Sequence, residues 1–219
     1  MPSHKPEQQG HQIVLVGDFN PKIFQPAWFG AEGLIQPSEV ESARIEIIHP
    51  EVVIFLLGWL RIEVTRERFS AGTQQEPYDE VIRDLVVGTF RLLRHTPVKM
   101  MGINREAHFR VESEKKWHAI GHTLAPPQMW EGVLIKPGMG SLTVTGVRPD
   151  SLRGKINVTV EPSTLFHPGI YVRINDHFES KDPASALGAD EIIGILEDHW
   201  TESSKRCTDI FKKVLENVK

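Results

Sequence analysis

The chain has 219 residues, with 25 basic and 29 acidic side chains and a formal net charge of -4. This length can bury a sizeable core without disulfides or metal ions. A composition that is 40% hydrophobic and 25% charged is ordinary for a globular protein and argues against disorder and against a membrane protein. With no excess of positive charge, no bulk field draws the chain to nucleic acid or to anionic lipid.

The single Cys207 excludes an internal disulfide. The opening residues MPSHKPEQQGHQ contain no apolar stretch of the length that a signal peptide needs. We therefore expect a cytoplasmic protein without membrane association. Residues 1–11 are polar and hold two Pro and a Gly, so we expect a flexible leader followed by a single α+β domain over residues 12–219.

In the first half, hydrophobic periodicity predicts four strands and two helices. A helix over residues 78–94 is the clearest element, because apolar side chains recur at helical spacing and acids occupy its first turn. A weak helix over residues 26–34 would turn Trp28 and Phe29 inward. The predicted strands span residues 13–16, 43–48, 52–60 and 60–65.

Residues 52–60, VVIFLLGWL, form the most apolar stretch, with nine successive residues that carry no polar side chain. A run this short and rich in β-branched and aromatic residues predicts a strand covered on both faces, and it is too short to span a bilayer. The cover would come from the Trp28 segment, from the leader, or from another subunit. Val53, Phe55 and Leu57 are therefore candidate partner-binding residues.

In the second half, a strand is expected over residues 98–103, with an extension toward residue 111. A helix over residues 113–124 follows, with Ser113 as its N-cap. Alternating segments predict three strands over residues 141–147, 155–160 and 170–178. The chain ends in an amphipathic helix, or a kinked pair of helices, over residues 189–217.

The two halves share the order strand, short helix, three strands, long helix. Phe69 would match Phe178, and the acids at 79–80 would match those at 190–191. This indicates an internal duplication of residues 12–96 and 97–219. The predicted fold is a curved antiparallel sheet with long helices on one face, made of two pseudo-symmetric β-α-β-β-β-α halves.

The passage LRIEVTRERFSAGTQQEPYDEVIRDL and the GIN at 102–104 resemble a sporadically distributed family of uncharacterised bacterial proteins. The resemblance runs over most of the chain. It implies a bacterial origin and a place in a multi-protein system such as antiphage defence. It implies no activity and no catalytic residue.

Candidate chemistry is sparse. Glu114, His118 and His122 are spaced to share one face of the helix over residues 113–124, which makes them weak candidates for a metal site. However, a HExxH motif is absent and three ligands on one helix rarely surround an ion, so we expect no metal and no cofactor. Cys207 has basic neighbours that would lower its pKa, but a lone helical thiol is more often structural.

The apolar sides of the strands are expected to face the helices, which leaves a polar face open. That face would present Arg44, Glu46, Arg61, Glu63, Thr65, Thr143, Thr145, Lys155, Asn157, Thr159, Arg173 and Asn175. Arg61, Arg173 and Asn175 are thus further partner-binding candidates. Acids interspersed along this face disfavour nucleic-acid binding, since they repel phosphate.

The sequence favours a noncatalytic protein-binding or assembly subunit, whose partner is a second copy of the chain or a companion protein. Two alternatives stay open. One is an enzyme of unrecognised type that uses His and carboxylate residues near the strand ends, such as His108 and His177. The other is nucleic-acid binding through the open sheet face.

Overall fold

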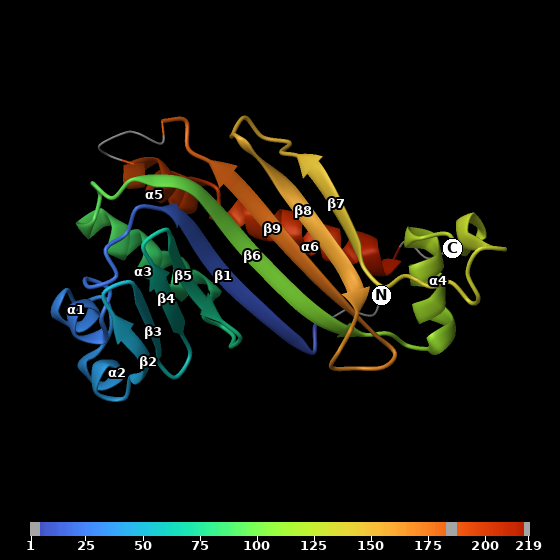
Figure 1. Ribbon diagram of the computed structural model, residues 1–219, viewed down its shortest axis with the longest axis horizontal. Helices are drawn as coiled ribbons and strands as arrows, with labels where there is room; N and C mark the ends of the chain where they lie inside the picture. The colour runs from blue at the N-terminus through green and yellow to red at the C-terminus, as the bar shows by residue number, and fades with distance from the viewer. Residues whose placement is uncertain (1–4, 183–187, 217–219) are drawn as a thin grey trace.

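The computed structural model shows an antiparallel sheet backed by helices on one face (Figure 1). It describes residues 5–182 and 188–216. The strands are β1 (Gln8–Gly17), β2 (Arg44–His49), β3 (Val52–Leu56), β4 (Arg61–Thr65), β5 (Arg68–Thr73), β6 (Val98–Arg110), β7 (Leu142–Val147), β8 (Gly154–Pro162) and β9 (Gly169–Glu179). The helices are α1 (Pro26–Ala31), α2 (Pro37–Glu41), α3 (Asp79–Leu92), α4 (Glu114–Leu124), the 3-10 turn η1 (Pro127–Trp130), α5 (Gly188–Asp198) and α6 (Trp200–Glu216).

The described strands form one open sheet in the order β2-β3-β4-β5-β1-β6-β9-β8-β7. The long strands β1 and β6 pair antiparallel at its centre, with Ile13 opposite Ile103. The four strands β2 to β5 lie on one side of this pair, and β7 to β9 lie on the other. This confirms the predicted α+β class. The sheet ends at two edge strands, β2 and β7.

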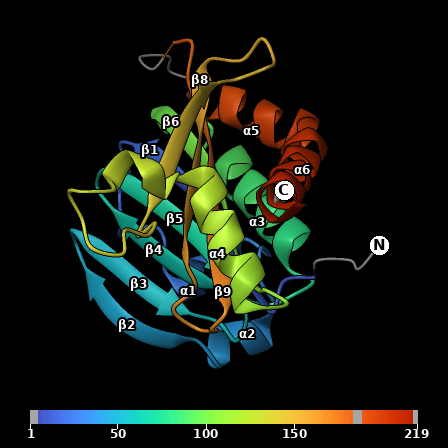
Figure 2. The same cartoon turned by 90° about the vertical axis from the view of Figure 1, so that its right-hand side faces the viewer.

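Helices α3, α5 and α6 form a layer on one side of the sheet (Figure 2). α3 packs against β1 and β5, α5 against β6, and α6 against β9. α3 and α5 also pack against each other. α4 lies at one end of the sheet, where Ser113 caps it as predicted by accepting a hydrogen bond from the Lys116 N–H at 3.2 Å.

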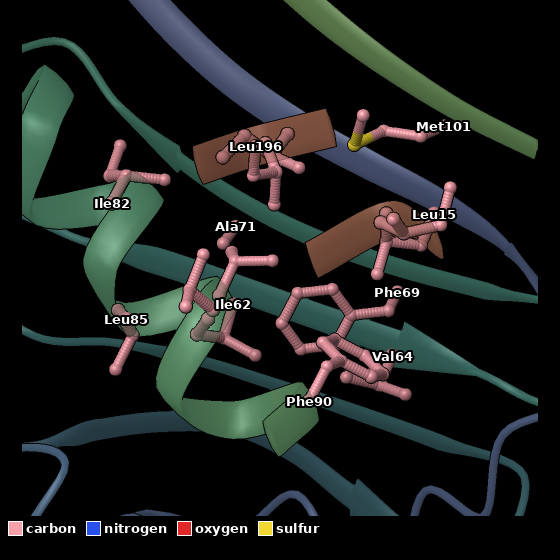
Figure 3. Close-up of a cluster of buried hydrophobic side chains, with 14 of the residues drawn as sticks. Leu15, Ile62, Val64, Phe69, Ala71, Ile82, Leu85, Phe90, Met101 and Leu196 are labelled. Atoms are coloured by element: carbon pink, nitrogen blue, oxygen red, sulfur yellow. The ribbon is translucent and has the colours of Figure 1, made fainter. Parts of the chain in front are cut away.

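The larger of the two hydrophobic clusters fills the space between this helix layer and the first half of the sheet. Phe90 of α3 lies edge-on to Phe69 of β5, with ring centroids 5.1 Å apart (Figure 3). Phe29 of α1 packs on Phe55 of β3 at 5.8 Å. Fully burying each such side chain contributes roughly 1.5–3 kcal/mol, so these rings supply a large share of the folding free energy.

The apolar stretch over residues 52–60 is divided between a strand and a turn. β3 ends at Leu56, and the backbones of Leu57 and Leu60 hydrogen-bond to each other across a tight turn that leads into β4. Val53, Phe55 and Leu57 are at most 3% exposed and belong to the core. Their burial removes them from any surface of the folded protein, so the three are wrong as partner-binding residues. The Phe29 segment covers them, and the alternate residues of β3 face the open side half-buried.

Other predicted boundaries need correction. β1 begins at Gln8, so the last residues of the expected leader are strand, while residues 1–4 lie outside the described chain. β5 was not predicted, so the first half has four strands after its short helices, where three were expected. α2 was also missed. The C-terminal helix is a kinked pair, α5 and α6, and the predicted residue 217 lies outside the described residues.

Candidate functional site

A groove of about 900 Å³ crosses the sheet on the side away from the helix layer. Its lining comes from the strands from β3 to β7 in the order of the sheet and from the turn at Leu57–Leu60. Gly10 and Gly72 line it on the neighbouring strands β1 and β5, and the side chains of Glu106 and Gln12 lie over these two glycines. The volume falls within the range of small-molecule and peptide sites. We refer to this feature as the groove.

A chain of side-chain amides runs across the groove. Thr145 donates to Asn157 Oδ1 at 2.8 Å, Asn157 Nδ2 to Asn175 Oδ1 at 3.1 Å, and Asn175 Nδ2 to Asn104 Oδ1 at 2.7 Å. These residues lie directly opposite one another on adjacent strands. Asn157 and Asn175 each use one acceptor and one donor within the sheet, and Asn104 uses its acceptor, so these bonds fix the three rotamers. We call Thr145, Asn157, Asn175 and Asn104 the amide ladder.

The row of amide side chains continues beyond the amide ladder. Gln12 of β1 stands opposite Asn104 and donates through Nε2 to the Ser70 hydroxyl at 2.9 Å. Among the described residues, nothing accepts from Asn104 Nδ2 or donates to Gln12 Oε1. The centre of the groove therefore offers an uncommitted donor beside an uncommitted acceptor.

Most charges that line the groove are paired. Arg61 bonds Glu46 at 2.7 Å and lies 3.8 Å from Glu63, and Arg68 reaches the same Glu63 at 3.2 Å. Glu106 accepts the Tyr171 hydroxyl at 2.5 Å, and burial together with this bond raises the pKa of Tyr171 well above its usual range. Arg173 is exposed and forms no hydrogen bond or ion pair with a residue that the structure describes.

The structure brings three of the predicted partner-binding residues into one place. Arg61, Arg173 and Asn175 all line the groove. The sequence also placed Asn157, Thr143 and Thr159 on this face, and they line it too. Glu106 and Gln12 were not predicted for the face, although their alternation with buried neighbours on β6 and β1 would have indicated it.

The weak metal candidates do not converge. The rings of His118 and His122 are 5.9 Å apart between centroids, but Glu114 turns away and lies 3.3 Å from His167 Nε2. Within residues 5–182 and 188–216, no group of three or more His, Cys, Asp or Glu side chains is arranged to hold a metal ion. Glu114, His118 and His122 are therefore surface residues of α4 without a common ligand position.

Cys207 is buried on α6. Burial raises the pKa of its thiol to about 12, and this outweighs the opposite effect of Arg105. The basic neighbour Arg206 is engaged elsewhere, with Asp150 and Asp176. The expectation of a lowered pKa is wrong, and the thiol is not a nucleophile at neutral pH.

The contact closest to a nucleophile and its base joins His108 and Ser163. His108 Nδ1 lies 2.9 Å from the Ser163 hydroxyl, and burial lowers the pKa of His108, so the ring is neutral. However, the same hydroxyl accepts the N–H groups of Leu165 and Phe166, and no described carboxylate bonds the other ring nitrogen. These features are those of a turn rather than of an activated serine.

Two groups of buried charges were not predicted from the sequence. Arg148 is held between Asp150 and Asp176, and Arg206 bridges the same two carboxylates at 3.0 and 2.9 Å. The Arg148 guanidinium also lies 3.7 Å from the Phe178 ring centroid. We call Arg148, Asp150, Asp176 and Arg206 the charge cluster. It joins the loop after β7 to β9 and α6, and it contributes to structure rather than to a site.

Arg105 is the second buried charge, 4% exposed. It donates to the Ser203 and Ser204 hydroxyls at 2.8 and 2.6 Å and lies 4.7 Å from the Trp200 ring centroid. His11 stands directly opposite Arg105 on β1. Burial, followed by the Arg105 charge, lowers the pKa of His11. The helix side of the β1–β6 pair thus favours a neutral imidazole.

This lowered pKa predicts a pH dependence of stability. The unfolded state binds a proton more readily than the folded state, so the free energy contributed by neutral His11 is complete above its ordinary pKa of 6.5 and is lost as the pH falls toward the lowered value. The lowered pKa values of His108 and His177 act in the same direction. We expect urea unfolding to show decreasing stability on acidification through this range, and a flatter profile for His11→Gln. Stability that rises on acidification would contradict the assignment.

No protein-family model matches the chain, and no curated protein matches it. The functional argument therefore rests on the geometry of the groove and of the sheet edges. No helix of the described part of the chain is long and apolar enough to cross a membrane.

Proposed function

We propose that the chain is a noncatalytic protein-binding and assembly subunit, and that its first partner is a second copy of itself paired along β2. The observation that carries the proposal is the exposure of this edge strand. All six residues of β2 are exposed, including Ile45, Ile47 and Ile48 at 53%, 42% and 47%. An edge strand with exposed isoleucines and a free row of backbone groups is a template for another strand.

The pattern of β2 is self-complementary. Ile45 and Ile48 pair with Phe55 and Val53 of β3, so both point to the helix side of the sheet. Two copies of β2 paired antiparallel about a twofold axis between Glu46 and Ile47 would place Ile45 opposite Ile48 of the second copy. The four isoleucines would then cover one another on that side. Such an isologous contact closes as a dimer and does not propagate.

Light scattering on the purified chain tests this proposal. We expect a dimer at tens of micromolar, and a monomer for Ile45→Lys with Ile48→Lys, because two lysines per copy would face each other across the axis. Val144→Lys on the opposite edge strand β7, where Val144 is 56% exposed, is the matched control and should stay dimeric. A wild-type chain that remains monomeric would refute self-pairing and leave a companion protein as the partner.

We also propose that the chain is a bacterial protein that works in a multi-protein system, as the resemblance implies. A duplication of the two halves belongs to the same proposal. It is supported by the antiparallel β1–β6 pair at the centre of the sheet and by the complete burial of both Phe69 and Phe178. The fourth strand in the first half departs from a strict repeat. Identification of the neighbouring genes and of co-purifying proteins tests the cellular setting.

A further inference from the structure

The groove has a chemistry of its own that β2 pairing does not use. We propose that it binds an extended peptide segment that carries an acidic residue, with the peptide backbone held by the amides at the groove centre and the acid held by Arg173. This site lies on the face of the sheet, whereas the proposed dimer contact lies along its edge. The inference is therefore independent of the proposed function.

The dimensions of the groove suit an extended chain. Its lining spans the eight strands from β3 to β7, and a spacing of roughly 4.8 Å between strands gives an extent of roughly 34 Å. An extended peptide of about ten residues has this length. The peptide would cross the strands, so that side chains of the sheet, and not a backbone edge, would hold it.

The centre of the groove matches a peptide group. Asn104 Nδ2 is a free donor and Gln12 Oε1 is a free acceptor on adjacent strands, and the amide ladder and the Ser70 hydroxyl hold both side chains in place. A peptide C=O and N–H supply the complementary acceptor and donor. Pre-positioned amides also reduce the entropy lost on binding.

The two ends of the groove differ, and this defines the sequence that would fit. At the β3 end, Leu56 and Trp59 line the wall, and both are half-buried, so an apolar peptide side chain would be favoured there. On β9, Arg173 is the lining arginine without a bonded partner, because Arg61 is already neutralised. An aspartate or glutamate of the peptide would pair with Arg173.

The same charges argue against a nucleic-acid strand. Glu63 and Glu106 line the groove with their carboxylates, and a phosphate backbone would pass both. Binding of a phosphate backbone requires a continuous stretch of positive charge. The neutral amides and paired charges of the groove do not provide one. A single acidic residue at Arg173 meets only the carboxylate of Glu106, which stands opposite Arg173 on β6, whereas a phosphate backbone repeats the repulsion at every nucleotide.

Selection from a displayed library of random peptides, long enough to cross the groove, tests the inference on the full chain. We expect the enriched peptides to share one acidic position and an apolar position several residues away. Fluorescein-labelled synthetic copies should lose about tenfold in affinity toward Arg173→Ala, and also when their acid is changed to its amide. Combining Arg173→Ala with the amide form of the peptide should reduce affinity little more than either change alone, because both changes remove the same contact.

Asn104→Ala should also weaken binding, and Lys212→Ala, which removes one exposed positive charge from α6, is the matched control and should not. Circular dichroism confirms that each variant is folded. Three results would overturn the inference: no enriched peptide, enriched peptides that bind Arg173→Ala and Asn104→Ala as well as the wild type, or a single-stranded oligonucleotide that binds through Arg173 more tightly than the peptides do. Light scattering is unaffected by Arg173→Ala, so failure here leaves the β2 dimer standing.

Discussion

We expect Val53→Lys to abolish folding. The Val53 side chain is fully buried in the larger core, on the face of β3 that Phe29 and the helix layer cover. A lysine there has no described carboxylate within the cluster, and an unpaired buried charge costs several kcal/mol, which is comparable with the total stability of about 5–15 kcal/mol expected for a domain. Circular dichroism and urea unfolding on the purified variant measure the loss.

The neighbouring residue provides the matched control. Ile54 is half-buried on the open face of the same strand, opposite Glu63 of β4. A lysine at position 54 can reach solvent and that carboxylate, so Ile54→Lys should fold with near wild-type stability. Equal damage from both substitutions would mean that both faces of β3 are covered, and it would contradict the arrangement described above.

Asp176→Ala is expected to be the most damaging loss of a polar group. Its carboxylate is 2% exposed and bonds Arg148 and Arg206 at once. Without it, the Arg148 guanidinium stays buried beside Phe178 and keeps Asp150 as its one carboxylate partner within the described residues, together with the His177 carbonyl at 3.3 Å. Removing one member of a buried ion pair costs about 3–5 kcal/mol. Thermal and urea unfolding should show a large decrease in the free energy of unfolding.

A surface ion pair provides the control for Asp176→Ala. Arg66 bonds Glu51 outside the core, with its side chain 66% exposed, and solvent screening leaves such pairs little net effect. Arg66→Ala should therefore leave the unfolding midpoint unchanged. A small effect of Asp176→Ala would show instead that the charge cluster is solvated, and that the loop after β7 is not fixed to β9.

Strict alternation made much of the fold predictable. The strands over residues 141–147, 155–160 and 170–178 lie within one or two residues of β7, β8 and β9, and the polar side of each faces the groove. In a strand, local sequence decides which residues share a face. β5 was missed because its sequence, RFSAGT, is short and rich in small residues that carry little strand preference.

The two faces of β3 could not be assigned from the sequence. Val53, Phe55 and Leu57 were partner-binding candidates for the case in which another subunit covers the strand. All residues from 52 to 57 are apolar, so alternation does not indicate which parity of residues faces the core of the chain. That parity follows from pairing with β2 and β4, in which Phe55 stands opposite both Ile45 and Ile62. A shift of one residue would exchange the faces, and only long-range pairing fixes it.

The residues of the candidate site also divide into those that the sequence predicted and those that it did not. Arg61, Arg173 and Asn175 were predicted on the open face because each follows from the alternation of its own strand. The amide ladder was not predicted, because it depends on the register of two successive hairpins and on the pairing of β6 with β9, where Asn104 and Asn175 are 71 residues apart. The charge cluster could not be predicted from the sequence either, since Arg148 and Arg206 lie 28 and 30 residues away from Asp176 in opposite directions along the chain.

Hydrogen–deuterium exchange along the two edge strands, measured at low and at high protein concentration, tests the central claim most directly. If two copies pair along β2, the amides of Arg44–His49 gain protection as concentration rises, while those of Leu142–Val147 on β7 exchange at the same rate throughout. Exchange in β2 that is independent of concentration, in a sample that stays monomeric, would contradict assembly through this edge.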